Sequence, residues 1–472
     1  MYTAPSFVTD NKDINCAYRL AVATVCANIL PFKDGLQKEE KDVIIAGLGY
    51  NTPWTRDAAI NTWNAGGIMY PDIAENTLLA VLKSGENGVM IGGEYWDSII
   101  WTVGAWYQYL YSGSKEFLKT AYTATVNTLE FFEKTEFSED LGLFRGPACY
   151  GDGVAAYSDI YAAHGHSGII KFAEFNKELC KKTGVGIPMH CLSTNCLYYI
   201  AYVIADKMAA ELGLKKQYKN RAQSLKDAIN EHFWSEEKGN YIYIVDDFGG
   251  CDSQEGMGVS FALLFGIADS EQAKKVIKNQ HITRYGIPCV YPTFARYFTP
   301  DRKSFGRHSG TVWPHIEGFW ASAVSKHRNT AAFDREFANE TDNALRYMQF
   351  AELYHPETGE MYGGKQEWLD RGIKDWHSES FQTWSATAYL RNCLMDIVGM
   401  DFTEKGIKFN PVGTTLARSA ELKGLKYRET TVNIKISGNG SNIKSFKLNG
   451  NETEPFLSCN ATGRQTVEIL LD

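Results

Sequence analysis

The sequence has no surplus of positive charge. Its 48 lysine and arginine residues are outnumbered by 56 aspartate and glutamate residues, which leaves a formal net charge of -8. A protein that binds nucleic acid or an anionic membrane surface would favour a basic patch. The composition therefore argues against both partners and fits a neutral small molecule or an oligosaccharide better.

The chain also lacks the segments that would carry it into or across a membrane. Residues 1–15 contain Asp10, Lys12 and Asp13 and show no basic stretch followed by an apolar one, so we expect no signal peptide. The apolar run 197–210 is interrupted by Asp206 and is too short to span a bilayer. We expect a cytoplasmic protein without a membrane partner, either a monomer or a homodimer.

Cysteine pairs at metal-binding or redox spacing are missing. The ten cysteines form no Cys-x-x-Cys motif, and most of them lie in apolar helical stretches, as Cys16 and Cys196 do. They are typical of reduced thiols in a protein core rather than of a disulfide framework.

Motifs for cofactor chemistry are absent as well. We find no Gly-x-Ser-x-Gly elbow, phosphate-cradling glycine loop or dinucleotide fingerprint in a strand-turn-helix context. His164 and His166 lie two residues apart, but no third ligand accompanies them, so the sequence predicts no metal site and no cofactor.

Aromatic residues, in contrast, are abundant. They make up 13% of the chain and include 11 tryptophans and 26 tyrosines. Flat amphipathic rings suit the apolar faces of sugars, although aromatic side chains also fill protein cores.

Helical periodicity dominates up to about residue 400. One face of a helix carries apolar residues over 197–212, and a second stripe over 218–233 follows after a short loop, which predicts two antiparallel neighbours. Ser114 and Asp269 are expected to cap helices over 115–134 and 270–278. We expect about twelve helices in all. If the long loops between them share one rim of a helical ring, their polar and aromatic residues meet in one cleft.

The pattern changes after residue 401. Residues 431–436 alternate with period two, a turn follows at 438–440, and strands are expected over 443–448 and 467–471. The sequence thus predicts a helical catalytic domain over 1–401 and a small antiparallel β domain over 402–472, to which we assign a packing role.

Few carboxylates lie among aromatics in the long loops, and glycosidic bonds are cleaved by pairs of such groups, one protonated and one ionised. They are Asp57, Glu94, Asp97, Asp152, Glu317, Glu352, Glu367 and Glu379. Glu352 stands in a segment, 350–359, that leaves a helix for a proline and glycine turn, and we interpret it as the base that activates water. Asp152, between Gly151 and Gly153, has the freedom a general acid would use, but an ordinary Asp-Gly turn would have the same sequence.

Other residues of these loops are candidates for binding the sugar. Arg56 and Asp57 could hydrogen-bond its hydroxyls beside Trp54, or could form a salt bridge at the start of a helix. Trp313 and Glu317 could form one wall of the cleft, or Trp313 could be a buried residue at a helix start. The remaining candidates are Trp96, Asp97, Trp376 and Trp384.

The order of these motifs over residues 50–395 resembles a clan of inverting glycosidases built on an (α/α)6 toroid, in particular bacterial members of glycoside hydrolase family 63 and their trehalase-like relatives. Five segments carry the resemblance. They are 54–57 (Trp-Thr-Arg-Asp), 192–243, which is similar to the family's central helix pair, 310–314 (Gly-Thr-Val-Trp-Pro), 352–359, which is similar to the segment that carries the family's base, and 381–386 at the start of the last helix. The resemblance implies an exo-acting α-glycosidase, with an α-glucoside as substrate and Asp152 as acid and Glu352 as base.

The sequence departs from the family at the acid. The family's loop has a Glu-Ser-Gly-x-Asp-Asn-Ser pattern, whereas residues 149–153 read Cys-Tyr-Gly-Asp-Gly. Asp97 and Asp159 are therefore alternatives to Asp152. The stretch 360–380 is longer than usual in the family, so Glu367 and Trp376 could form a subsite of this protein.

Two other kinds of protein stay open. A sugar phosphorylase on the same fold would need a basic phosphate pocket, for which Arg296, Arg307 and His308 are candidates, and a sugar epimerase would need paired catalytic histidines. A carbohydrate-binding protein without activity would keep the cleft and lack the acid.

Overall fold

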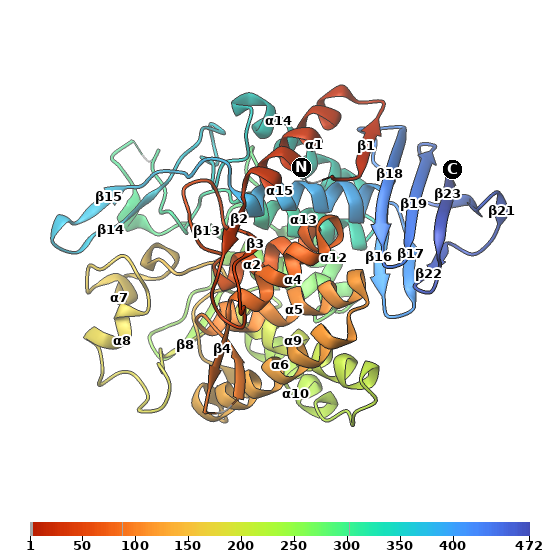
Figure 1. Ribbon diagram of the computed structural model, residues 1–472. Coiled ribbons are helices and arrows are strands. Elements are labelled where there is room, and N and C mark those ends of the chain that lie inside the picture. The colour runs from red at the N-terminus through yellow and green to blue at the C-terminus, as the bar shows by residue number, and fades with distance from the viewer. Residues whose placement is uncertain (1–2, 87, 302) are drawn as a thin grey trace.

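The computed structural model describes residues 3–86, 88–301 and 303–472, and its body is a packed group of helices with a sheet at one side (Figure 1). In the described part of the chain, six helices follow one another as packing neighbours, and the last returns to the first. They are α2 (Thr55–Asn61), α5 (Tyr95–Ser112), α9 (Leu192–Glu211), α11 (Gly256–Leu264), α13 (Pro314–Lys326) and α15 (Thr383–Arg391).

Burial separates these helices from a second set. Nearly every residue of α5, α11 and α13 is buried, as expected for helices surrounded by protein on all sides. The second set is buried on one face only and mostly packs against the first: α1 (Lys12–Ala27), α4 (Pro71–Ala80), α6 (Lys115–Thr135), α10 (Lys219–Phe233), α12 (Ser270–Asn279) and α14 (Thr330–Tyr347). The alternation of buried and amphipathic helices matches the sequence periodicity.

Local capping signals determine several helix ends. Ser114 caps α6 by accepting from the backbone N–H of Phe117, and Asp269 forms a capping box with Gln272 at the start of α12, as predicted. The first helix ends at Ala27, and a strand that contains Pro31 follows it.

Paired glycines such as Gly66 and Gly67 commonly end a helix, but here they do not. The chain instead continues through a wide π turn, η1 (Thr62–Gly66), into α3 (Gly67–Met69). A side chain on Gly67 would lie 2.7 Å from the ring of Tyr111 on α5. These glycines therefore serve close helix packing rather than termination. A similar π turn, η5 (Asn392–Ile397), extends α15.

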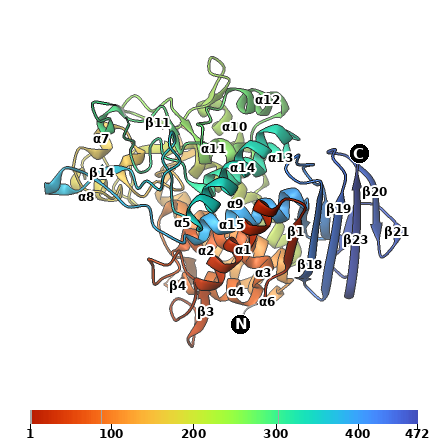
Figure 2. The ribbon, with the colours of Figure 1, turned by 90° about the horizontal axis from the view of Figure 1, so that it is seen from above.

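Short two-stranded ladders occupy the connections between helices. They pair β2 (Ile29–Phe32) with β3 (Lys41–Ile44), β4 (Leu82–Gly85) with β5 (Gly88–Ile91), β6 (Phe137–Ser138) with β7 (Leu143–Phe144), β8 (Met189–Cys191) with β11 (Ile244–Asp246), β9 (Trp234–Ser235) with β10 (Asn240–Tyr241), β12 (Gln254–Glu255) with β13 (Val290–Tyr291), and β14 (Lys365–Glu367) with β15 (Ile373–Asp375). The β14–β15 hairpin projects with α7 (Asp159–Ala162) and α8 (Lys171–Phe175) from one side of the body (Figures 1 and 2). Three 3₁₀ turns complete the connections: η2 (Val154–Ala156), η3 (Ala295–Tyr297) and η4 (Leu369–Arg371).

The C-terminal strands form a sheet on the other side of the helices (Figure 2). The order is β1 (Ser6–Thr9), β18 (Ser419–Tyr427), β19 (Thr430–Ser437), β23 (Gly463–Leu471), β20 (Ile443–Leu448) and β21 (Asn451–Glu452), and β16 (Met400–Thr403), β17 (Gly406–Phe409) and β22 (Phe456–Ser458) form a smaller sheet.

Two features of this sheet were not predicted. The strand β1, from the other end of the chain, pairs antiparallel with β18. The expectation of a purely antiparallel sheet is wrong, because β19 and β23 run parallel. A long connection through β20 to β22 separates those two strands, and parallel neighbours need such a crossover, whereas the sequence pattern of a strand does not reveal its partner.

Two further observations bear on the environment of the protein. All ten cysteines are free thiols. No helix among the described residues is long and apolar enough to cross a membrane.

Candidate active site

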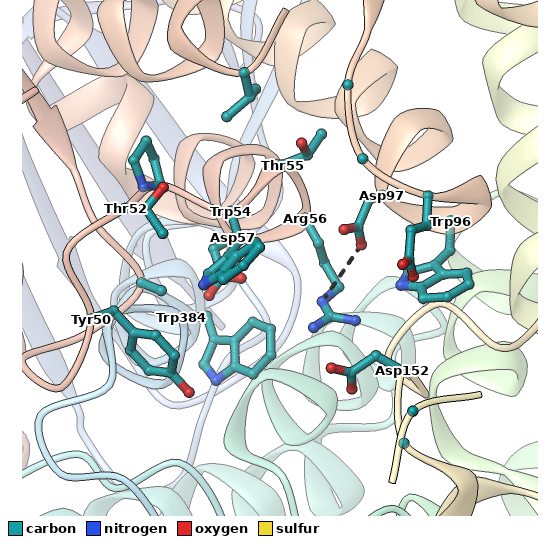
Figure 3. A pocket seen from close by; sticks show the side chains of 18 of the residues that line it. Tyr50, Thr52, Trp54, Thr55, Arg56, Asp57, Trp96, Asp97, Asp152 and Trp384 are labelled. Carbon is teal, nitrogen blue, oxygen red and sulfur yellow. Dashed lines mark ion pairs between the residues drawn. The ribbon is translucent and has the colours of Figure 1, made fainter. Parts of the chain in front are cut away.

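A cleft of about 790 Å³ lies among the described residues, and none of the residues that line it belongs to the C-terminal sheet. Ten of the eleven predicted site residues line it: Trp54, Arg56, Asp57, Trp96, Asp97, Asp152, Trp313, Glu352, Trp376 and Trp384. The structure thus brings together residues that lie up to 330 positions apart in the sequence, from Trp54 to Trp384. Figure 3 shows how Arg56 reaches into the space between Asp97, Asp152 and Trp384.

The first turns of the buried helices supply most of these side chains. Trp54 precedes α2, Asp97 lies in the first turn of α5, Trp313 precedes α13, and Trp384 lies in the first turn of α15. Helix N-termini present free N–H groups and positive partial charge. A cleft that these ends surround can therefore hold several carboxylates close together.

Arg56 is the central cation of this group. Its Nε lies 3.8 Å from Oδ1 of Asp97, and its guanidinium lies 5.4 Å from the ring centre of Trp384. Burial raises the pKa of Asp57 to about 7 and that of Asp97 to about 6, and neighbouring carboxylates add to both shifts while Arg56 opposes them. Burial, with the nearby charges of Asp97 and Asp152, raises the pKa of Glu94 to about 7.

Arg307 holds the predicted base. Its Nη2 donates to Oε2 of Glu352 at 2.6 Å, and its Nη1 donates to the carbonyl oxygens of Gly363 and His377. Glu352 is buried, and the backbone beside it is fixed because Val312 and Tyr354 exchange hydrogen bonds of 3.0 and 2.8 Å. The segments 310–314 and 352–359, which the sequence singled out separately, are therefore paired.

His308, the next residue, holds the predicted acid. Its Nε2 lies 3.1 Å from Oδ1 of Asp152, whose side chain is 57% exposed. Burial alone would raise the pKa of Asp152, but the hydrogen bond to His308 and the charges of Arg56, His308 and Arg307 outweigh it and lower that pKa well below its usual range.

Glu317 does not line the cleft. Its side chain is completely buried one turn into α13, and burial together with Glu336 and Glu340 raises its pKa well above the usual value. No residue of α13 itself lines the cleft, and only Trp313, which directly precedes this helix, does. A role for Glu317 as a wall of the cleft is therefore not supported by its position.

Two other candidates from the long loops, Glu367 and Asp159, form their contacts outside the cleft. Glu367 accepts from Arg296 at 3.0 Å and from Tyr297 at 2.6 Å, and its neighbour Gln366 lines the cleft instead. Asp159 is exposed and pairs with Arg296. Neither residue belongs to the cleft lining.

The three basic residues considered for a phosphate pocket thus lie against carboxylates: Arg296 against Glu367 and Asp159, Arg307 against Glu352, and His308 against Asp152. Their charge is compensated before any ligand binds. This arrangement offers a phosphate ion little attraction. The described residues contain no group of three or more His, Cys, Asp or Glu side chains that could hold a metal ion.

Sequence reasoning missed Tyr50, Gln366 and Gln382, which line the cleft. Gln382 directly precedes α15 beside Trp384, so its place at a helix start was a usable signal. Tyr50 and Gln366 lie in irregular or short extended segments and carry no local signal of their position.

Comparison with known proteins places the chain among glycosidases. The model of the mannosylglycerate hydrolase MGH1-like glycoside hydrolase domain matches residues 56–385. This match confirms the resemblance to enzymes like those of glycoside hydrolase family 63. No curated protein sequence matches the chain.

Solved structures share the fold at low identity. A sialidase has a TM-score of 0.68 at 12% identity, and the match covers 99% of this chain and 40% of the sialidase. The GH63 mannosylglycerate hydrolase from Thermus thermophilus in complex with glucose has a TM-score of 0.59 at 15% identity over 79% of this chain and 99% of that one. A GH78 rhamnosidase from Bacillus sp. GL1 has a TM-score of 0.58 at 15% identity, and the match covers 99% of this chain and 44% of the rhamnosidase. The chain thus spans less than half of the sialidase and of the rhamnosidase.

Proposed function

The chain belongs to the mannosylglycerate hydrolase MGH1-like glycoside hydrolase family and is a glycosidase, and from this premise we propose that it is an exo-acting hydrolase that cleaves an α-glycosidic bond with inversion. In this proposal Asp152 is the general acid and Glu352 the general base. The observation that carries it is that both carboxylates line one cleft and that consecutive residues, His308 and Arg307, hold one each.

The environment of Glu352 suits a base. A guanidinium at hydrogen-bond distance stabilises a carboxylate rather than a carboxylic acid, and the backbone N–H of Glu379 donates to the same oxygen at 3.3 Å. An ionised carboxylate can take a proton from a water molecule that attacks the anomeric carbon.

The polar atoms around the cleft suit a ligand with many hydroxyl groups. Several buried atoms have no hydrogen-bond partner among the described residues, and those in the cleft belong to Arg56, Asp57, Trp96, Asp97, Trp376, Gln382 and Trp384. Buried polar groups normally find partners, so a bound sugar would satisfy them. Trp54 is half exposed at the cleft and offers a flat face for stacking.

We extend the proposal to architecture and location. The closed series of six helices, counted over the described residues, supports an (α/α)6 toroid with residues 1–401 as the catalytic unit and 402–472 as a packing unit. The ten free thiols support a reducing compartment such as the cytoplasm. An α-glucoside is the substrate to test first, and an α-mannoside comes next because the T. thermophilus enzyme with the same fold is a mannosylglycerate hydrolase.

The test combines a substrate panel with two variants. α-Linked disaccharides and aryl α-glycosides are screened, and NMR follows the anomer that is released first. We expect the β-anomer from an α-glycoside. D152N and E352Q should each lower kcat by roughly 10²–10⁴-fold while sugar binding, measured by calorimetry, is retained. D159N, at an exposed carboxylate outside the cleft, is the control.

Three outcomes would overturn the proposal. Release of the α-anomer would exclude inversion. Full activity of D152N together with loss of activity in D97N would transfer the role of acid to Asp97. Acceleration of substrate consumption by phosphate, with formation of a sugar phosphate, would make the enzyme a phosphorylase.

A further inference from the structure

The proposed acid presents a chemical problem that the cleft itself resolves. A general acid must carry a proton when the glycosidic bond breaks, yet the cations around Asp152 favour its ionised form. The group within hydrogen-bond distance of Asp152 that can hold a proton near neutral pH is His308.

His308 is held in one orientation. The side chain is buried, and its ring lies on that of Trp313 with the centroids 5.0 Å apart and the planes at 25°. Its Nδ1 lies 3.2 Å from Oε1 of Gln366. An amide oxygen can only accept a hydrogen bond, so Nδ1 carries a hydrogen and donates it.

This hydrogen bond determines what Nε2 can do. With Nδ1 protonated, Nε2 of a neutral imidazole is an acceptor, and it carries a hydrogen only when the ring is charged. A hydrogen bond across the contact of 3.1 Å between Nε2 and Oδ1 of Asp152 therefore requires one proton, which either the histidine or the carboxyl supplies.

The residue after the acid makes room for this arrangement. A Cβ atom on Gly153 would lie 2.0 Å from Oε1 of Gln366 and 2.7 Å from Nδ1 of His308. Its φ of -95° is available to any residue, so the glycine is required by the approach of His308 and Gln366 and not by backbone strain. The family that the sequence resembles has Asp-Asn-Ser in this loop, whereas this chain has Asp-Gly at 152–153. The close approach of His308 and Gln366 explains the glycine.

We propose that His308 is a positioning residue and a proton reserve for Asp152, with Gln366 setting its tautomer and Gly153 admitting both side chains. The inference rests on the proposed function, since it takes Asp152 as the acid. It assigns one proton to the Asp152–His308 pair in the resting enzyme.

The proton count of a turnover is balanced. Asp152 gives the shared proton to the glycosidic oxygen as its bond to the anomeric carbon breaks, and the leaving group departs as an alcohol. Glu352 takes a proton from the water whose oxygen bonds to that carbon. Afterwards Glu352 loses its proton to solvent, and the Asp152–His308 pair takes one up.

Other charged groups surround this pair and contribute to its titration. The basic neighbours are Arg56 of α2, Arg307, and His315 in the first turn of α13, and the acidic ones are Asp57 of α2, Glu94 and Asp97 at the start of α5, and Glu352. The test therefore compares variants of the same enzyme and not absolute pH values.

The main test is the pH profile of kcat/KM for H308Q. This variant keeps an N–H donor but cannot carry a proton charge. The basic limb of the wild-type profile reports loss of the proton that the pair shares. In H308Q that proton would belong to a carboxyl alone, whose ordinary pKa lies about 2.6 units below that of histidine. We expect the basic limb to move to lower pH by at least about one unit.

The second readout is the leaving group. We expect H308Q to lower kcat for a glycoside with an alkyl leaving group by roughly 10–10²-fold at pH 7, and to change it little for a dinitrophenyl glycoside, because a good leaving group needs no proton. H281Q is the matched control, since His281 also stacks on an aromatic ring, at 3.5 Å from Tyr291, but lies outside the cleft lining.

G153A is an independent variant that keeps the histidine at position 308 but crowds its ring and the amide of Gln366. It should reproduce the leaving-group dependence of H308Q, and circular dichroism would verify that both variants are folded. A basic limb that stays in place or moves to higher pH in H308Q overturns the inference, as does wild-type behaviour of G153A. If D152N lowers kcat equally for alkyl and dinitrophenyl glycosides, Asp152 is not the general acid. That result would refute the proposed function itself, whereas the results for H308Q and G153A test only the role of His308.

Discussion

At the residue scale, the charge of one arginine controls most of the carboxyl groups in the cleft. The positive charge of Arg56 acts against the raised pKa values of Asp57, Glu94 and Asp97 and contributes to the lowered pKa of Asp152. Its own guanidinium is nearly buried and lies against the ring of Trp384. Few other substitutions would disturb the cleft as broadly.

We predict that R56M lowers kcat/KM at least about tenfold and destabilises the protein by roughly 1–3 kcal/mol at pH 8. Without the cation, the folded-state pKa values of Asp57 and Asp97 rise further above those of the unfolded chain. A group with a raised folded pKa loses its contribution to stability as the pH rises from the unfolded value through the folded one. The loss in R56M should therefore be larger at pH 8 than at pH 5, as measured by urea unfolding.

The control for this prediction is R221M, which breaks an ion pair of 2.8 Å with Glu133 at the surface. Exposed pairs contribute at most about 1 kcal/mol, and their effect should be similar at both pH values. An equal loss of stability in R56M at pH 5 and pH 8 would contradict the account of Asp57 and Asp97.

At the element scale, the contact between α13 and α14 contains three buried glutamates. Glu317 projects from α13, and Glu336 and Glu340 lie one turn apart on α14. Burial and their mutual proximity raise the pKa values of Glu317 and Glu340, and burial raises that of Glu336 to about 8. The raised pKa values favour the neutral form of all three carboxyls at neutral pH. Glu336 accepts a hydrogen bond from the backbone N–H of Ile287, whereas the side-chain oxygens of Glu317 and Glu340 have no hydrogen-bond partner among the described residues.

The pH dependence follows from the sign of these shifts. Below the unfolded pKa, near 4.5, both states are protonated and Glu336 contributes fully. Between about 4.5 and 8 the unfolded chain ionises while the folded protein does not, so stability falls as the pH rises.

We predict that E336Q is as stable as the wild type near pH 5 and more stable by roughly 1 kcal/mol or more at pH 8. The amide oxygen of the variant can still accept the hydrogen bond that Ile287 N donates to Glu336 at 3.2 Å. Thermal unfolding at the two pH values would measure the difference. E271Q, at an exposed glutamate of α12 paired with Lys274, should show no such gain, and a gain of equal size at pH 5 would refute the prediction.

At the scale of the whole molecule, the two ends of the chain meet in one sheet. The strand β1 pairs with β18 over residues 6–9, and Phe7 points into the core, where its ring lies 5.2 Å from that of Tyr18 on α1. Val8 points to the other face and is half exposed. The N-terminal strand thus connects the helical body with the C-terminal sheet.

We predict that F7A destabilises the protein by about 3–5 kcal/mol, because it leaves a cavity in the core, whereas V8A changes the stability by less than about 0.5 kcal/mol. Urea unfolding would measure both. Since no residue of the sheet is among the described residues that line the cleft, kcat of the folded F7A protein should equal that of the wild type. A loss of kcat in F7A under conditions where it is folded would show that the sheet does more than pack.

Local interactions made part of this structure predictable. The caps at Ser114 and Asp269 involve backbone groups two or three residues away, so the sequence contains everything they need. The amphipathic stripes of the helices and the order of the Trp-Arg-Asp, Trp-Pro and Glu352 segments are also properties of the chain itself. They sufficed for the family and for ten of the eleven predicted site residues, but not for Tyr50, Gln366 and Gln382, which also line the cleft.

Contacts between distant segments decided the rest. The sequence by itself determined which carboxylates and aromatics were available, but the pairing of Arg307 with Glu352 and of His308 with Asp152 joins positions 45 and 156 residues apart. Likewise, only the packing of α13 turned Glu317 away from the cleft, and only the crossover to β23 made the last strand parallel. The charge state of a carboxyl depends on burial and on its neighbours in space, and neither is encoded in the residues beside it in the chain.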